Sequence, residues 1–272
     1  MSTKINEAPR RDMAKTQRGI QSIDVGGRVL AALTRSSGAM MLKELAEAAG
    51  MPAAKAHAYL VSFCRLGLVE QDAVSGRYDL GAFALELGLL ALNRLDAVRV
   101  ATAEMTGLAA RTGHSTAIAV WGNHGPTVVR LVESVHPVYV NMRTGTVMEL
   151  HLTATGKVFA AFASAAQIEA HLASASTRQR SELRRALAAI APELDQVRRR
   201  GLARAQGHPV PGVNAFSAPV FDHTGEIALV LTVLGAAAEF DATWGSLIAA
   251  DLRAAARRVS DRLGAREAPD ES

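Results

Sequence analysis

Residues 41–80, MLKELAEAAG MPAAKAHAYL VSFCRLGLVE QDAVSGRYDL, decide the fold of the N-terminal part of the chain. Apolar residues recur at helical spacing within residues 42–49, which predicts a short amphipathic helix: Leu42, Leu45, Ala46 and Ala49. Gly50 favours the left-handed conformation that ends a helix, and Pro52 suits the start of the next one. The stretch therefore predicts two helices joined by a tight turn.

The second predicted helix, residues 53–66, has a core face and an outer face. A helical wheel places Ala56, Leu60 and Phe63 on the core face. The second helix of a helix-turn-helix enters the major groove of DNA, where base edges are read. The outer face and its two edges therefore supply the candidate DNA contacts: Ala54, Lys55, His57, Ala58, Ser62 and Arg65.

A short hairpin is predicted directly after this helix. Residues 68–71 and 77–80 have strand-like composition, and residues 72–76 between them contain turn formers. Arg77 is expected at the hairpin tip, within reach of a phosphate or the minor groove, as a further DNA contact. The whole order predicts a winged helix-turn-helix. A small helical bundle with a hairpin and no role in nucleic-acid binding is the plain alternative.

Length and composition favour two domains in a soluble protein. The chain has 272 residues, of which 49% are hydrophobic, enough for two cores. Residues 1–80 carry 11 Lys/Arg against 8 Asp/Glu, and the remainder carries 19 against 18, so DNA affinity would rely on phosphate contacts from a dimer. Cys64 is the one cysteine and is expected to fill the core. The absence of a long apolar run and a polar N-terminus predict a cytoplasmic protein that does not bind membranes.

The segments around the predicted winged helix-turn-helix complete the domain organisation. Residues 1–17 and 265–272 are expected to be flexible tails, and a helix at residues 22–33 completes a DNA-binding domain over residues 18–82. Residues 83–99 are predicted as a linker helix. Its apolar residues predict packing either on its own chain or on the second subunit of a dimer.

The pattern changes after a further helix at residues 100–112. Strands are predicted at residues 116–121, 127–134, 139–142, 216–221 and 227–234. Helices are predicted at residues 153–173, 181–200 and 244–263. The fold class of residues 100–264 is therefore α+β, with an antiparallel sheet that carries helices on one face.

Five segments together resemble the IclR family of bacterial transcriptional regulators: residues 22–33, 42–52 (LKELAEAAGMP), 75–81 (SGRYDLG), 151–157 (HLTATGK) and 212–222 (GVNAFSAPVFD). The resemblance covers nearly the whole chain. It implies an N-terminal winged helix-turn-helix, a linker helix and a C-terminal GAF-like domain that binds a small-molecule effector. It also implies a homodimer or homotetramer on a palindromic operator in double-stranded DNA.

The resemblance also implies which residues line the effector pocket: Asn141, Thr155, Gly156, Asn214, Ala215, Thr232 and Leu234. A glycine near a helix N-terminus leaves backbone N–H groups open to a ligand oxygen, although a helix cap explains Thr155 and Gly156 equally well. Many relatives have Arg-Cys where this chain has Asn214 and Ala215, and often Ser in place of Leu234. We therefore expect a larger, partly apolar effector, such as an aromatic or acyl carboxylate.

No catalytic, metal or cofactor site is predicted. A phosphate-binding loop would need glycine where His151 stands, and His151 is expected to be a satisfied core residue. Residues 198–200, three arginines before Gly201, are expected to be a solvated helix end. The sequence thus predicts a one-component regulator, a repressor by family habit. Ala54 and Ala58, where relatives commonly carry Ser and Arg, leave open an effector-sensing adaptor without sequence-specific DNA binding.

Overall fold

The computed structural model describes residues 19–134 and 142–265. The chain divides into two compact units, residues 1–94 and residues 95–272. Within the described residues, no helix is both long enough and apolar enough to cross a bilayer.

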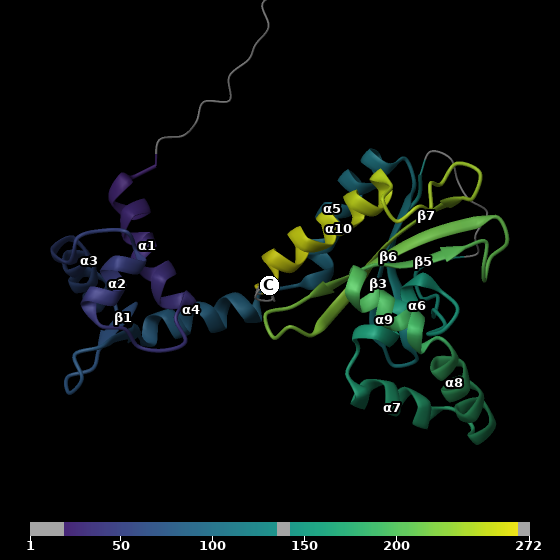
Figure 1. Cartoon of the computed structure of the whole chain (residues 1–272), viewed down its shortest axis with the longest axis horizontal. Coiled ribbons are helices and arrows are strands. Elements are labelled where there is room, and N and C mark those ends of the chain that lie inside the picture. The colour runs from purple at the N-terminus through teal and green to yellow at the C-terminus, as the bar shows by residue number, and fades with distance from the viewer. Residues whose placement is uncertain (1–18, 135–141, 266–272) are drawn as a thin grey trace, which may run out of the picture. The chain divides into compact units, whose positions relative to one another are not determined.

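The first unit is the predicted winged helix-turn-helix (Figure 1). Its elements in chain order are α1 (Gln21–Arg35), α2 (Leu42–Ala48), α3 (Ala53–Arg65), β1 (Val69–Gln71), β2 (Tyr78–Leu80) and α4 (Ala82–Asn93). Gly50 has a φ of 63°, as expected for the residue that ends the first helix of the pair. The core brings all three N-terminal helices and the hairpin together through Val29, Leu45, Leu60 and Tyr78.

The predicted linker helix of residues 83–99 is wrong in extent. α4 ends at Asn93, and α5 (Ala97–Thr112) begins after Asp96, whose carboxylate accepts a hydrogen bond from the backbone N–H of Arg99 at 3.0 Å. This cap satisfies a free N–H at the start of α5 and fixes the break. α4 keeps large apolar side chains exposed: Phe83, Leu85, Leu87, Leu89 and Leu90.

The second unit is built on a five-stranded sheet in which every neighbouring pair is antiparallel. The strands are β3 (Ser115–Gly122), β4 (Gly125–Val132), β5 (Ala203–Gln206), β6 (Val213–Phe221) and β7 (Ile227–Ala236), in the order β4-β3-β7-β6-β5. Four of them confirm predicted strands. β5 was not predicted, since it is short and carries Arg204 and Gln206. Of the strand predicted at residues 139–142, all but Met142 lie outside the described residues.

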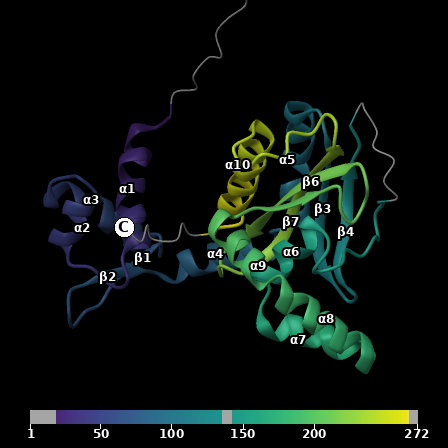
Figure 2. The same cartoon turned by 45° about the vertical axis from the view of Figure 1, so that its right-hand side comes forward.

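Helices cover both faces of this sheet, so the prediction of helices on one face is wrong (Figures 1 and 2). α5 and α10 (Leu247–Arg262) pack on the face that carries Phe216, Leu231 and Val233. α6 (Ala154–Phe162) and α9 (Ala191–Arg200) pack on the face that carries Ala119 and Val230. Because consecutive residues of a strand point to opposite faces, β7 contributes to both cores.

Two predicted helices are each split in two. The helix predicted at residues 153–173 is α6 followed by α7 (Ala165–Ser174), and Ser164 caps α7 by accepting a hydrogen bond from the backbone N–H of Gln167. The helix predicted at residues 181–200 is α8 (Thr177–Ala189) followed by α9, with Pro192 in the first turn of α9. Apolar periodicity continues across both breaks, and the capping residues and Pro192 mark them.

Candidate functional site

The outer face of α3 is arranged as the helical wheel predicts. Its candidate DNA contacts are all exposed: Ala54, Lys55, His57, Ala58, Ser62 and Arg65. Ala56 and Leu60 on the opposite face have no solvent exposure. A recognition helix needs one face packed in the core of its domain and the opposite face exposed to contact the major groove. α3 has both.

Arg77 closes the loop at the tip end of the hairpin, where its carbonyl oxygen accepts a hydrogen bond from the backbone N–H of Asp72 at 2.9 Å. One guanidinium nitrogen of Arg77 donates a hydrogen bond to the carbonyl oxygen of Ala39 at 3.0 Å and lies 3.6 Å from the carboxylate of Glu44. At the tip, backbone and side-chain hydrogen bonds from Ser75 lower the pKa of Asp72. Arg77 therefore lies at the tip end of the hairpin, and its side chain holds the hairpin against the segment around α2.

A small cavity opens between α6, β6 and β7 on the α6 face of the sheet. It encloses about 70 Å³. Four of the seven predicted effector contacts line it: Thr155, Ala215, Thr232 and Leu234. Apolar side chains form most of the remaining wall, among them Met142, Met148, Val210 and Val213. The cavity at this end of the sheet is therefore mainly apolar and contains a few hydroxyl groups.

Two of the hydroxyl groups that line this cavity, those of Thr155 and Thr232, form a closed ring with a third, that of Ser217. The Oγ1 atoms of Thr155 and Thr232 lie 2.9 Å apart, and the Oγ atom of Ser217 lies 2.7 Å from Thr232 and 3.3 Å from Thr155. All three residues are buried. Ser217 was not predicted, although it stands two positions after Ala215 on β6 and therefore shares its face of the sheet.

Gly156 serves the fold at the start of α6. Its backbone N–H donates to the Oγ1 atom of Thr153, the cap of α6, at 2.9 Å. A Cβ atom at Gly156 would clash with the carbonyl oxygen of Glu149. The amide of Gly156 is thus engaged in the cap, and the prediction that it stays open for a ligand is wrong.

Asn214 and Asn141 do not contribute to the described cavity. Asn214 points to the opposite face of the sheet from Ala215, and its side chain accepts from the N–H of Gly207 at 3.1 Å and donates to the carbonyl oxygen of Phe240 at 3.5 Å. The prediction of Asn214 as a pocket residue is therefore wrong. Asn141 lies outside the described residues.

His151 is half-buried and differs from the satisfied core histidine that was predicted. Its Nδ1 atom is buried and has no hydrogen-bond partner in the described part of the chain. The side chain lines a separate hollow of about 510 Å³ together with His171 and Met148. Burial lowers the pKa of His171.

Comparisons with known proteins agree with this two-unit organisation. The family model for the helix-turn-helix domain of IclR matches residues 22–73, and the model for the C-terminal part of the bacterial transcriptional regulator IclR matches residues 89–261. The solved structure of HmgR from Pseudomonas aeruginosa is 39% identical, has a TM-score of 0.81 and covers 92% of this chain and 100% of its own.

Characterised regulators resemble the chain over most of their length. The glycerol operon regulatory protein of Streptomyces coelicolor is 30% identical over 253 residues, which are 91% of this chain and 98% of the relative. The transcriptional repressor IclR of Escherichia coli is 24% identical over 223 residues, which are 79% of this chain and 80% of the relative. The chain therefore belongs to the IclR family of bacterial transcriptional regulators.

Proposed function

We propose that this regulator is a repressor that a partly apolar carboxylate, aromatic or acyl, releases from a palindromic operator. The observation that carries the choice of effector is the cavity beside α6, in which apolar walls surround buried hydroxyl groups. The name of the similar E. coli protein, transcriptional repressor IclR, supports the choice of repression.

The wall chemistry of the cavity favours an effector with an apolar body. The wall includes the apolar side chains of Met142, Met148 and Leu234. Each methylene group of a ligand that is buried against them should strengthen binding by about 0.8 kcal/mol. The hydroxyl groups of Thr155 and Thr232 are the polar partners available to a carboxylate oxygen. A very small keto acid has too little carbon to use these walls.

The size of the cavity requires adjustable walls. Its volume of about 70 Å³ is well below the roughly 300–1,000 Å³ of ordinary small-molecule pockets. Methionine is unbranched and repacks readily, so Met142 and Met148 are the side chains that would move to admit a ring or a short chain. The effector's preference for one conformation of the protein would then shift the DNA-binding equilibrium.

DNA binding is assigned to the exposed face of α3, and a homodimer or homotetramer is assigned to the apolar surface of α4. The exposed leucines of α4 stand on opposite sides of the helix, Leu87 and Leu90 on one and Leu85 and Leu89 on the other. An exposed helix with this composition is unfavourable in water. A dimer covers it and supplies two reading heads for a palindrome.

The proposal contains no catalytic step and places the protein in the cytoplasm. His208 is the one titratable side chain among the described residues that line the cavity, and no carboxylate lines it. The hydroxyl groups of the ring bond to one another, and among the described residues no hydrogen bond joins any of them to a base that could activate it.

The DNA assignment is tested by measuring binding to the promoter region beside the protein's own gene over a range of salt concentrations. Lys55→Ala should weaken binding by about tenfold and reduce the salt slope by about one per subunit, since one cationic contact is lost. Arg178→Ala removes the same charge from α8 and should change neither quantity. Equal effects of the two variants, or no salt-dependent binding, would contradict the assignment and favour an adaptor without DNA binding.

The effector assignment is tested by calorimetric titration of the full chain with benzoate, hexanoate, glyoxylate and pyruvate. Benzoate or hexanoate should bind at least about tenfold more tightly than the two keto acids, because each buries more hydrocarbon. Ala215→Leu fills the cavity and should abolish this binding, whereas Ala170→Leu on the surface of α7 should not. Micromolar binding of glyoxylate or pyruvate would contradict the assignment. The acid that binds, benzoate or hexanoate, should also weaken binding of the protein to its operator.

A further inference from the structure

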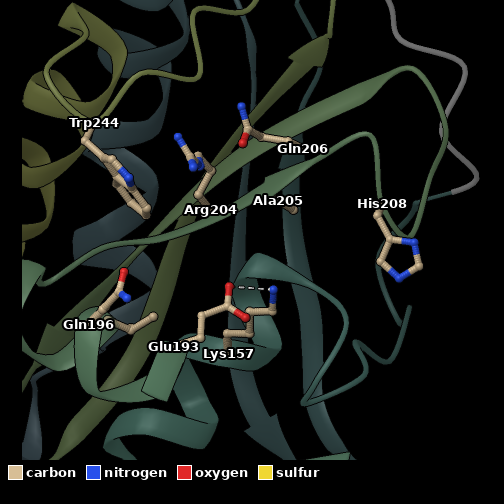
Figure 3. Close-up of a pocket in the computed structure, with 9 residues that line it drawn as sticks. Lys157, Glu193, Gln196, Arg204, Ala205, Gln206, His208 and Trp244 are labelled. Carbon is tan, nitrogen blue, oxygen red and sulfur yellow. Dashed lines mark hydrogen bonds and ion pairs between the residues drawn. The ribbon is translucent and has the colours of Figure 1, made fainter. Parts of the chain in front are cut away.

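A second hollow, of about 390 Å³, runs along β5 at the edge of the sheet (Figure 3). We call it the β5 groove. Polar and charged side chains from α6, α9 and β5, together with a tryptophan, line it: Lys157, Glu193, Gln196, Arg204, Gln206 and Trp244. In Figure 3 the Lys157–Glu193 pair faces Arg204 and Gln206 across the groove. This polar lining contrasts with the apolar cavity beside α6.

Two guanidinium groups gather at one end of the groove. The guanidinium carbon of Arg204 lies 4.4 Å from the centre of the Trp244 ring, and that of Arg200 lies 4.5 Å from it. Residues 198–200 are exposed at the end of α9, as the predicted solvated helix end requires, and the guanidinium group of Arg200 also packs on an aromatic ring. The aromatic face attracts both cations, although it does not neutralise them.

Neither arginine of this pair forms an ion pair within the described residues. No described carboxylate lies within ion-pair distance of Arg200 or Arg204, and Glu193 is paired with the Nζ atom of Lys157 at 2.8 Å. Partial burial and then the neighbouring Arg200 lower the pKa of Arg204, and Glu193 acts in the opposite direction. Two adjacent cations held this way are stabilised by a bound anion.

We propose that the β5 groove binds a small molecule carrying carboxylate or phosphate groups, with Arg204 as its principal contact. A planar guanidinium presents donors in a fork that matches such anions. One guanidinium nitrogen of Arg204 donates a hydrogen bond to the carbonyl oxygen of Ala242 at 2.8 Å, and the other donors remain available to a ligand. The amides of Gln196 and Gln206 supply further donors along the groove. The groove volume lies within the usual range for small ligands, roughly 300–1,000 Å³.

The groove is a separate site from the effector cavity but shares a wall with it. Ala205 and His208 line both hollows. The anion site is independent of the identity of the effector, because none of its charged residues lines the apolar cavity. Occupancy of the groove is thus a second chemical input to the same domain.

Trp244 provides the signal for the test. The chain has two tryptophans, so Trp121→Phe leaves Trp244 as the fluorescent reporter in the full-length protein. This background is titrated with inorganic phosphate and with citrate at constant ionic strength. At least one anion should change the fluorescence saturably, with a Kd of about 1 mM or tighter. Saturation by phosphate, by citrate or by both supports the proposal and tells the phosphate and carboxylate chemistries apart.

Charge-matched variants assign the signal to the groove. Arg204→Gln should weaken binding by about tenfold or more, whereas Arg199→Gln, an exposed arginine on the same helix as Arg200 and outside the groove lining, should leave it unchanged. Gln196→Glu adds a negative charge to the groove without touching the bond between Arg204 and Ala242, and should also weaken binding by about tenfold. If Arg204→Gln fails to fold, the Gln196→Glu variant alone tests whether the fluorescence change arises from the groove.

Three outcomes would overturn the proposal. These are the absence of a saturable change with either anion, an equal loss in Arg199→Gln, and unchanged binding in Gln196→Glu. Ala215→Leu, which fills the effector cavity, should keep anion binding in the groove. A result against the anion site can therefore be distinguished from a result against the proposed effector site.

Discussion

Thr155 and Thr232 are 77 residues apart in the chain, yet their side-chain oxygens lie 2.9 Å apart inside the second unit. The contact joins the first turn of α6 to the middle of β7, and Ser217 on β6 completes it. Three elements that are distant in sequence are thus tied together by hydroxyl groups at the cavity wall. This tie contributes both to the stability of the domain and to the chemistry of the cavity.

Thr232→Val removes one hydroxyl group of the ring while keeping the shape of the side chain. We expect the free energy of unfolding in urea to fall by about 1 kcal/mol, the ordinary net contribution of a buried hydrogen bond. Thr177→Val, on the exposed start of α8, should leave it unchanged. Equal stability of the two variants would show that the ring does not stabilise the fold.

Gly156→Ala places a methyl group against the backbone of Glu149 and Leu150. Because those are main-chain atoms that cannot swing away, we expect a loss of about 3 kcal/mol or more in the free energy of unfolding. Gly107→Ala in α5 is the matched control, since the added methyl meets the movable end of Arg111. That change should be neutral or stabilising by up to about 1 kcal/mol. A tolerated Gly156→Ala would show that α6 and residues 149–150 separate readily.

His171 should make the stability of the second unit depend on pH. Burial lowers its pKa below the usual 6.5, so the folded protein holds the neutral form. The folded protein therefore has its full stability at pH values above the pKa that His171 has in the unfolded chain. This contribution to the free energy of unfolding is lost as the pH falls from that pKa towards the lower pKa of the folded protein. Urea unfolding at pH 7.5 and 5.5 should therefore show a smaller difference in His171→Gln than in the parent. His124→Gln, at an exposed position, should keep the parent's difference, and a smaller difference there too would point to a general effect of histidine charge.

Glu44 should protect the start of α2. Its carboxylate accepts a hydrogen bond from the backbone N–H of Met41 at 2.8 Å and pairs with Arg77 at 3.6 Å. We expect Glu44→Ala to lose about 1 kcal/mol of local stability, measured as faster hydrogen exchange at the Met41 amide. Glu44→Gln keeps the acceptor and should exchange nearly as slowly as the parent, because an exposed ion pair contributes little. Fast exchange in both variants would assign the protection to Arg77 instead.

Sequence patterns predicted the first unit well because its decisive signals are local. Helical spacing, Gly50 and Pro52 all lie within α2 and α3 or beside them, and a wheel of α3 separates Leu60 from Lys55 without any tertiary information. The second unit depends on contacts between distant segments. The near-continuous apolar run of residues 227–234 was the local sign that β7 is buried on both faces.

The cavity beside α6 was predicted in part, and the errors in its predicted lining follow from strand geometry. Thr155, Ala215, Thr232 and Leu234 come from the family resemblance and line the cavity. Asn214 came from the same resemblance, but adjacent strand residues point to opposite faces, so Asn214 faces away from the cavity that Ala215 lines. The same alternation identifies Ser217, two positions further along β6. The β5 groove had no comparable signal, since Lys157, Arg204 and Trp244 meet only in the folded chain.

The hydroxyl ring of Thr155, Ser217 and Thr232 has no built-in direction. Each hydroxyl hydrogen can rotate, so the three hydrogen bonds of the ring can run in either direction, and Thr155 or Thr232 can turn its hydroxyl group towards the cavity to donate or to accept a hydrogen bond. The ring can therefore hydrogen-bond a carboxylate, an alcohol or an amide. If the effector binds in this cavity as proposed, its apolar wall supplies the discrimination, and exchange of Met142, Met148 or Leu234 should change which molecule binds while the ring stays the same.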